Sequence, residues 1–500
     1  MTAGRQWLLT VGSVAVVVPL GVVLPFDRII VLVVAVLIAV VAPLLLAWRL
    51  RTTHHGLGVL LVSAVLFPFE VLANSVVGTQ QQIAGTQQQL VLTSGCFLLA
   101  GVVCGTWILR QMLLRRSAPI DSSRLVLAAV MLGCISILSF IIGQFPWFDV
   151  PPAPMRAQIG GLGLFLLSVG VFLVVGHEVK ALRHLRRLTW LFVGTGGLAV
   201  VGMFIPISDI AVGRLGITAH GSVGSLFFTW LVAMSVSQAL CNPRISGTTR
   251  VLALAVAAVT IGRGLFSTFD WASGWVPPLV ALGTVLLLRF PRTTLASGLL
   301  LAAPGFFAVG RAWEALMTYE RWSWLTRVEA QRVMWQVIER EPWLGFGPAN
   351  YHYYTPLFSI LGYNIRFNSH NNYIDVVAQT GIIGLLLFVW LSVEAVRLAL
   401  RLRARLPRGF EHAYAVGALG GIAGSLVAGL LADWIVPFVY NIGIAGFRSS
   451  MLFWFFLGGL VALRRCTDVA PVRVEARTPG REHRFSPWAL PEGVAPGVNV

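Results

Sequence analysis

The chain has 500 residues, of which 57% are hydrophobic and only 11% are charged, and its mean hydropathy is +0.80. No aqueous core could bury so large an apolar fraction, so this composition excludes a soluble enzyme, a disordered protein and a nucleic-acid-binding protein. The formal net charge of +17 needs no polyanionic partner, because the arginines lie mostly between apolar runs, where positive charge retained in the cytoplasm accounts for it. The five cysteines include no CxxC pair, and we expect neither a metal nor another cofactor.

Long apolar runs follow one another from the N-terminus, starting with residues 7–26 and 29–48. The last three are residues 376–396, 413–432 and 437–463. They are about 17 to 27 residues long, enough for a helix to cross a bilayer. We therefore expect an all-α fold, a polytopic integral membrane protein with about 12–14 transmembrane helices that include the first run, and no sheet.

Arginine-bearing connectors alternate along the chain with connectors that carry almost no positive charge, which predicts the orientation. The rich connectors include those around Arg115, Arg186 and Arg289, and the run from Arg397 to Arg408. The positive-inside rule places them, and both termini, in the cytoplasm. Lys180 is the single lysine among 37 basic residues, which is typical of a GC-rich genome and indicates the plasma membrane of a bacterium.

One outer connector differs in kind from the others. Residues 311–375 form the longest polar stretch between apolar runs and contain many tryptophans, tyrosines, arginines and glutamates. Helical spacing predicts an amphipathic helix over residues 311–340, with Val328, Gln331 and Trp335 on its apolar face. Pro342 would end the helix, and residues 345–348 would form a tight turn with an exposed backbone.

His370 is the most informative residue of this outer loop. It lies in the string Asn368-Ser369-His370-Asn371-Asn372-Tyr373, which leads directly into an apolar run. Histidine exchanges a proton near neutral pH, so His370 suits a general base at the outer surface of the membrane, acting on a substrate with one end in lipid. The alternative is that His370 only anchors the start of the helix, with Asn371 satisfying its free backbone amides.

Two arginines are candidate partners of His370. Arg263 lies at the outer end of an apolar run, where a charge is costly unless it faces a cavity or a partner, and Arg327 lies on the predicted loop helix. The planar guanidinium group suits phosphate oxygens, so the two could hold a pyrophosphate beside His370. Alternatively, Arg263 reaches the lipid headgroups and Arg327 lies on a solvated helix face.

Other polar residues are weaker candidates for binding substrate. Glu70 is an ionisable group within an apolar run, and it could serve the acceptor or a structural hydrogen bond. Asp433 and Arg448 bracket the last outer connector and could join the site, and Arg366 and His352 share the loop with His370.

Three motifs in this order resemble the O-antigen ligase and polymerase family. They are Gly-Arg-Gly at 262–264, Arg327 followed by Glu-Pro-Trp-Leu-Gly-Phe-Gly at 341–347, and the block from His370 to Gly384. The resemblance covers roughly residues 250–395. The chain departs from the family pattern at Gln379, where an acidic residue is common, and at Gln331, where an aromatic residue is common.

The resemblance implies a metal-independent glycosyltransferase with a GT-C-like membrane fold. It would move a glycan from undecaprenyl pyrophosphate to the hydroxyl of a lipid-, glycan- or protein-linked acceptor outside the plasma membrane. His370 would be the base, Arg263 and Arg327 would stabilise the leaving pyrophosphate, and Asn371 and Tyr373 would orient the site.

The expected organisation has four parts. They are an N-terminal transmembrane bundle (1–249), a catalytic region (250–396) with the outer loop 311–375, the C-terminal spans (397–465) and a flexible cytoplasmic tail (466–500). A ligase and a polymerase are not separated by these motifs. The rival hypotheses are a transporter or flippase of lipid-linked sugar or a small anion, and a purely structural membrane partner protein.

Overall fold

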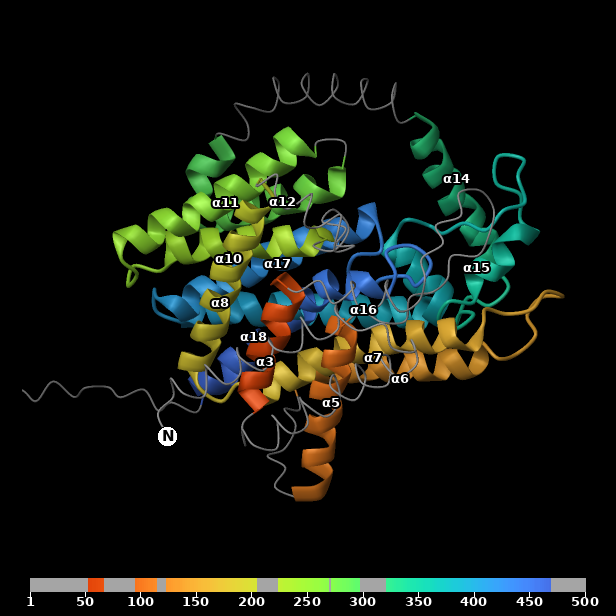
Figure 1. Ribbon diagram of the computed structural model, residues 1–500, viewed down its shortest axis with the longest axis horizontal. Helices are drawn as coiled ribbons and strands as arrows, with labels where there is room; N and C mark the ends of the chain where they lie inside the picture. Colours follow the sequence, from red (N-terminus) through yellow and green to blue (C-terminus); the bar gives the residue numbers. More distant parts are fainter. Residues whose placement is uncertain are drawn as a thin grey trace, which may run out of the picture.

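In the computed structural model the chain is all-helical over the part that the structure describes, residues 53–66, 95–114, 123–204, 224–268, 271–296 and 321–468 (Figure 1). An isolated bridge between Ile360 and Tyr363 is the single β pairing within these ranges. The α-helices are α3 (Thr53–Leu66), α5 (Gly95–Leu114), α6 (Arg124–Ile142), α7 (Met155–Glu178), α8 (Leu182–Gly202), α10 (Gly224–Cys241), α11 (Gly247–Ser267), α12 (Ala272–Arg289), α14 (Arg321–Ile338), α15 (Tyr351–Tyr354), α16 (Asn372–Arg405), α17 (Phe410–Leu431) and α18 (Phe447–Asp468), with 3-10 turns at Thr355–Leu357 and Ile444–Gly446.

Within the described ranges, eight helices are long and apolar enough to cross a membrane, and α3 and α5 contain shorter apolar stretches. The expectation of an all-α, multi-pass membrane protein is therefore confirmed. Of the predicted spans, residues 7–26 and 29–48 and most of 294–310 lie outside the described residues, as do Glu70 and the tail from residue 469.

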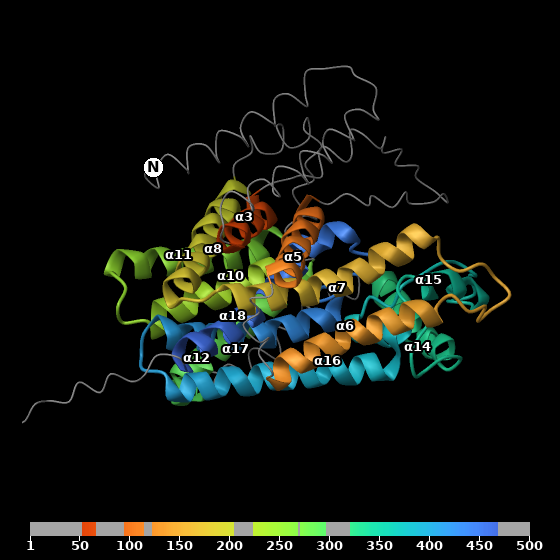
Figure 2. The ribbon, with the colours of Figure 1, turned by 90° about the horizontal axis from the view of Figure 1, so that it is seen from below.

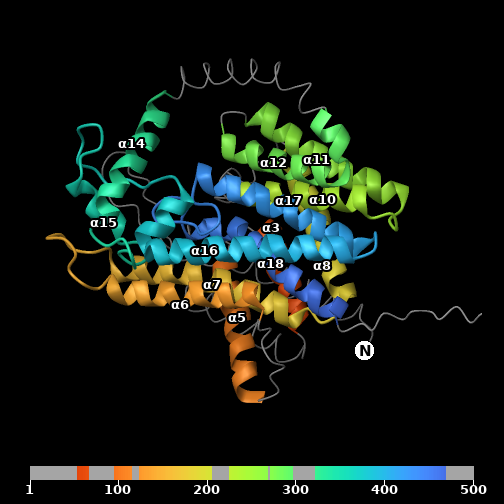
Figure 3. The same cartoon turned by 180° about the vertical axis from the view of Figure 1, so that it is seen from behind.

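The helices pack as a bundle with one polar segment at its end. Helices α10, α12 and α17 pack together, α18 packs on α7, and α16 lies along α6. The segment with α14 and α15, coloured teal, lies at the end of the bundle where α16 begins (Figures 2 and 3). The opposite end of α16 carries Arg397, Arg401, Arg403 and Arg405. The arginine-rich helix ends therefore lie away from the segment that contains His370.

A break in α16 explains the glycine-rich motif of the loop. Gly381 has φ +71°, and a Cβ atom there would collide with the backbone of Trp343. Residues 342–347 fill the break, because Phe346 N donates to Ala378 O (2.9 Å) and Ile382 N donates to Pro342 O (2.8 Å). Broken backbone at membrane depth is tolerated where protein covers it. Residues 345–348 are buried, so the predicted exposed turn is wrong.

Helix α14 begins at Arg321 in the described residues and ends at Ile338, two residues before the predicted end. Its buried side chains are Ala330, Val333, Met334, Val337 and Ile338, which form a small core with Phe346 and Tyr351. Val328 and Trp335 are exposed, at 59% and 48%, so the predicted face that carries them does not pack on the core of the loop. That core packs against a different side of the helix.

The last span begins later than predicted. Residues 437–443 belong to an irregular connector, and the apolar helical segment begins at Ile444. The connector contains Pro437 and Gly443, which has φ +73°, and neither favours a continuous helix. This connector, residues 432–443, packs beside the start of α16 and forms part of the site.

Candidate functional site

His370 lies just before α16, in the left-handed region of backbone conformation with φ +49°. The following residue, Asn371, is the N-cap: its Oδ1 accepts from Tyr373 N (3.0 Å) and Ile374 N (3.4 Å). The capping role considered for this string therefore belongs to Asn371, which leaves the His370 side chain available for other contacts.

A pocket of about 150 Å³ opens beside His370. Its lining is mostly apolar and comes from α14 and from residues 360–370, with Thr326, Asn368 and His370 among its polar members. Three lining side chains, Leu361, Tyr363 and Ile365, are also exposed. The pocket therefore joins the imidazole of His370 to a largely apolar rim.

Arg327 approaches His370 from α14. Burial, and to a smaller extent the positive charge of Arg327, lowers the pKa of His370 to about 4. His370 is therefore neutral at physiological pH and has an unprotonated ring nitrogen. A neutral imidazole beside a guanidinium group can accept a proton while the arginine holds an anion.

The connector 432–443 brings a buried carboxylate close to His370. Asp433 is completely buried and accepts a hydrogen bond from Phe438 N (2.5 Å) and another from the Asn441 side-chain amide. The same Asn441 Nδ2 lies 3.4 Å from His370 Nδ1. Burial raises the pKa of Asp433 to about 6, and the two hydrogen bonds oppose the rise.

Asp375 forms a second buried acidic position, on the first turn of α16. Its Oδ1 accepts from Tyr351 Oη (2.5 Å) and from Ser369 Oγ (2.8 Å). Burial and then the charge of Asp375 raise the pKa of Tyr351 well above its usual range. Since Ser369 adjoins His370, this network fixes the backbone on which His370 is carried.

Two neighbouring residues tie the start of α16 to the rest of the site. Tyr373 Oη donates to Leu426 O of α17 (2.6 Å). Asn372 Oδ1 accepts from Ile435 N (2.8 Å) and Val436 N (3.0 Å), and its amide donates to Val436 O (2.9 Å). The predicted residues Asn371 and Tyr373 therefore lie beside His370, where they hold the local backbone.

Arg366 and His352 lie in an adjoining aromatic cluster. The Arg366 guanidinium lies 3.9 Å from the centre of the Tyr353 ring, and His352 stacks on Tyr440. His352 Nδ1 is 2.9 Å from Phe367 O, and burial lowers the pKa of His352 to about 4. Arg366 thus shares the outer loop with His370 and contacts the ring of Tyr353.

Arg263 and Arg448 lie elsewhere. Arg263 lies over the ring of Phe228, and ring contacts continue from Phe228 to Trp271 and from Trp271 to Trp434, next to Asp433. Arg448 is buried and donates from Nε to Ala64 O of α3 (3.1 Å). Among the contacts of the described residues, neither arginine touches His370.

Sequence reasoning missed several residues of the His370 cluster. Asp433 was considered, but Asn441, Asp375, Tyr351 and Ser369 were given no role. Asn441 is separated from His370 by 71 residues, and an asparagine in a connector gives no signal of its own. Asp375 could have been found, because it is a carboxylate at the edge of an apolar run.

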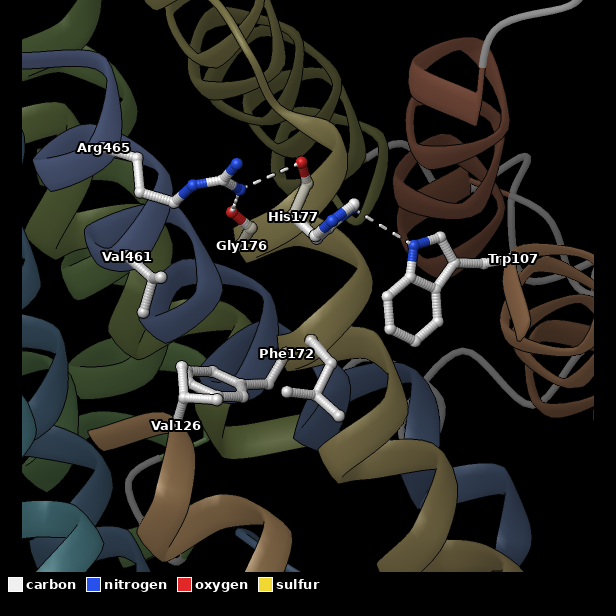
Figure 4. A pocket seen from close by; sticks show the side chains of 8 residues that line it. Trp107, Val126, Phe172, Gly176, His177, Val461 and Arg465 are labelled. Atoms are coloured by element: carbon white, nitrogen blue, oxygen red, sulfur yellow. Dashed lines mark hydrogen bonds between the residues drawn. The ribbon is translucent and has the colours of Figure 1, made fainter. Parts of the chain in front are cut away.

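A second polar cluster lies around the C-terminal end of α7, where His177 and Arg465 approach each other (Figure 4). His177 Nδ1 accepts from Trp107 Nε1 (3.5 Å) and lies 3.5 Å from Glu178 Oε1. Arg465 Nη1 donates to the carbonyls of Gly176 (2.9 Å) and His177 (3.1 Å) and so caps the end of α7. The cavity here has a volume of only about 10 Å³, which is enough for a water molecule and too small for a substrate.

No curated protein sequence matches the chain. Residues 214–389 match the profile of the O-antigen ligase family, and the matched region contains Arg263, Arg327 and His370. That family implies an enzyme that transfers glycan and uses lipid-linked glycan substrates. The chain is therefore a multi-pass membrane protein in which residues 214–389 match the O-antigen ligase family.

Proposed function

We propose that the protein transfers a glycan from a polyprenyl pyrophosphate, such as undecaprenyl pyrophosphate, to an acceptor hydroxyl at the outer face of the bacterial plasma membrane. His370 is the general base, and Arg327 and Arg263 bind the pyrophosphate. The observation that carries the proposal is the position of a neutral His370 on a 150 Å³ pocket, with Arg327 near enough to lower its pKa.

The chemistry follows from these groups. The acceptor hydroxyl gives its proton to His370 while its oxygen bonds to the anomeric carbon of the sugar. The bond between that carbon and the phosphate oxygen breaks, and its electron pair leaves on the pyrophosphate. Negative charge grows on the leaving group, and fixed arginine cations in a water-poor site stabilise it.

Arg327 and Arg263 take different parts of the leaving group in this proposal. Arg327 faces His370 and stabilises the phosphate that bears the leaving oxygen. Arg263 is on α11, beside the aromatic contacts that run through Trp271 to Trp434. It receives the phosphate nearer the lipid chain, which enters along the apolar side of the bundle.

The proposed orientation follows the distribution of arginines. Arg289, Arg403 and Arg465 lie at one end of the bundle, on or against the ends of α7, α12, α16 and α18. In the proposed orientation this end and both termini face the cytoplasm. The pocket beside His370 then opens on the outer side.

The proposal is tested by glycan transfer with purified full-length protein in vesicles, with a polyprenyl-pyrophosphate glycan, an acceptor and EDTA present. Wild type should release polyprenyl pyrophosphate and form the new glycosidic bond. Arg327→Ala should reduce the rate by about 10²- to 10³-fold, the effect of removing one donor to a developing anion. Vesicles that move labelled lipid-linked glycan across the bilayer without breaking its bond to phosphate would instead establish a transporter.

A further inference from the structure

Asn441 links His370 to Asp433 through a single atom. Its Nδ2 is hydrogen bonded to Asp433 Oδ1 and lies 3.4 Å from His370 Nδ1. The Asp433 carboxylate is completely buried and also accepts from Phe438 N. The amide of Asn441 therefore contacts both titratable groups.

The charge on Asp433 determines which way this amide faces. A carboxylate only accepts hydrogen bonds, so an ionised Asp433 requires the NH₂ group of Asn441 on its side. The second hydrogen of that NH₂ group then points to His370 Nδ1, which must present a lone pair. The neutral imidazole consequently carries its proton on Nε2.

In this tautomer Nε2 already carries the ring proton and cannot accept another. Protonation of Asp433 favours the other tautomer. The protonated carboxyl group donates, so the Asn441 amide turns over and presents its oxygen to both neighbours. His370 Nδ1 then carries the proton and donates it to that oxygen. Nε2 is left with a lone pair that can receive the proton of the acceptor hydroxyl.

We propose that Asn441 is a positioning residue that sets the tautomer of His370 according to whether Asp433 carries a proton. This inference rests on the proposed role of His370 as the base. It goes beyond that role, because it specifies which ring nitrogen is available and which distant group controls it.

The surroundings supply the conditions that the switch needs. The positive charge of Arg327 on α14 acts on His370, and Asp375 of α16, hydrogen bonded to Tyr351 of α15, is the acidic neighbour of Asp433. Burial raises the pKa of Asp433 to about 6, so both of its forms exist near neutral pH. The pKa of His370 is about 4, so its ring remains neutral throughout that range.

The direct test is solid-state NMR of the histidine ring nitrogens in full-length protein reconstituted in lipid. The chain has nine histidines, and the His370 signals are those missing from a His370→Gln sample. Wild type should hold the proton on Nε2 at about pH 8 and on Nδ1 at about pH 5, on either side of the Asp433 pKa. The same tautomer at both pH values overturns the proposal.

Two variants separate a tautomer switch from a merely structural contact. Asp433→Asn imitates the protonated carboxyl group, so His370 should hold the Nδ1 proton at both pH values. Asn441→Leu removes the amide while filling its space, so the tautomer should no longer follow the charge of Asp433. A His370 tautomer in Asp433→Asn that still changes with pH contradicts the mechanism.

Transfer rates give an independent reading. The wild-type rate should fall as the pH rises above about 6, approaching about tenfold per pH unit, and Asp433→Asn should lose this decline. If His370→Ala retains transfer, the base assignment fails although the NMR result can stand. If His370→Ala loses transfer and the tautomer of wild type does not change with pH, the inference about Asn441 alone fails.

Discussion

The protein contains two histidine clusters at opposite ends of its bundle, one around the buried His177 and one around the half-buried His370, and they differ in what surrounds the imidazole. His177 lies 3.5 Å from a carboxylate and beside an indole N–H, in a cavity of about 10 Å³. His370 is linked to the Asp433 carboxylate through Asn441, and it lines a pocket of about 150 Å³ with Arg327 nearby.

The comparison teaches that a histidine with polar partners does not by itself define an active site. The His177 cluster closes the end of α7, where Arg465 caps two carbonyls and little space remains. The His370 cluster combines an open pocket, a nearby cation and an indirect link to an acid. These three features can be tested one at a time.

The largest expected effect is the loss of the base. His370→Ala should reduce glycan transfer by about 10²- to 10⁴-fold, the usual contribution of general-base catalysis, while thermal unfolding changes little. His177→Ala is the matched control and should keep transfer within about twofold per folded molecule. Equal losses in the two variants would remove the distinction between the clusters.

The break in α16 should matter for folding more than for chemistry. Gly381→Ala places a Cβ atom at φ +71° against the backbone of Trp343, and the backbone conformation alone costs about 1–3 kcal/mol. We expect a clearly lower thermal unfolding temperature in detergent. Gly283→Ala, in a helical position with open space around it, is the control and should be neutral or stabilising. A Gly381→Ala protein as stable as wild type would contradict the packing described for residues 342–347.

The cap at the arginine-rich end should contribute moderately to stability. Arg465→Met removes the donors to Gly176 O and His177 O, and lost hydrogen bonds of this kind cost about 1–3 kcal/mol. Thermal unfolding should shift downward, whereas transfer per folded molecule should not change. A specific loss of transfer with unchanged stability would assign a functional role to this end.

The smallest expected effect is on the pKa of His370 in Arg327→Gln. Removal of the positive charge should raise this pKa from about 4, but only slightly, since burial is the larger cause of the lowering. The protonated, inactive ring would then persist to a higher pH than in wild type. An NMR titration of His370 measures the change, and an Arg327→Lys variant, which retains the charge, should show less of it.

Much of the fold could be predicted because membrane helices are long apolar runs. The predicted secondary structure and exposure were wrong at two places where tertiary packing overrides the local sequence pattern. Residues 437–443 are apolar enough to resemble a span, but Pro437, Gly443 and the contacts of buried Asp433 keep them irregular. The turn at residues 345–348 is buried because it fills the break at Gly381, a contact that local sequence does not reveal.

Part of the site could also be predicted from the local sequence. Arg327 and His370 were recognised because ionisable residues in an aromatic outer loop are conspicuous, and they lie close together. Asn441 and Asp375 were not, since their roles come from tertiary contacts with Asp433, Tyr351 and Ser369. Arg263 remains a prediction, because it contacts Phe228 and not the His370 cluster in the described residues.

The central claim is that His370 removes the proton from the acceptor hydroxyl. It is tested most directly by chemical rescue of His370→Ala with imidazole, in vesicles that contain the variant, a polyprenyl-pyrophosphate glycan and an acceptor. We predict that transfer is lost and that imidazole restores part of it, more effectively as more of the added imidazole is unprotonated. Transfer at the wild-type rate without imidazole would contradict the claim, as would a loss that imidazole cannot restore in a variant that still binds the donor.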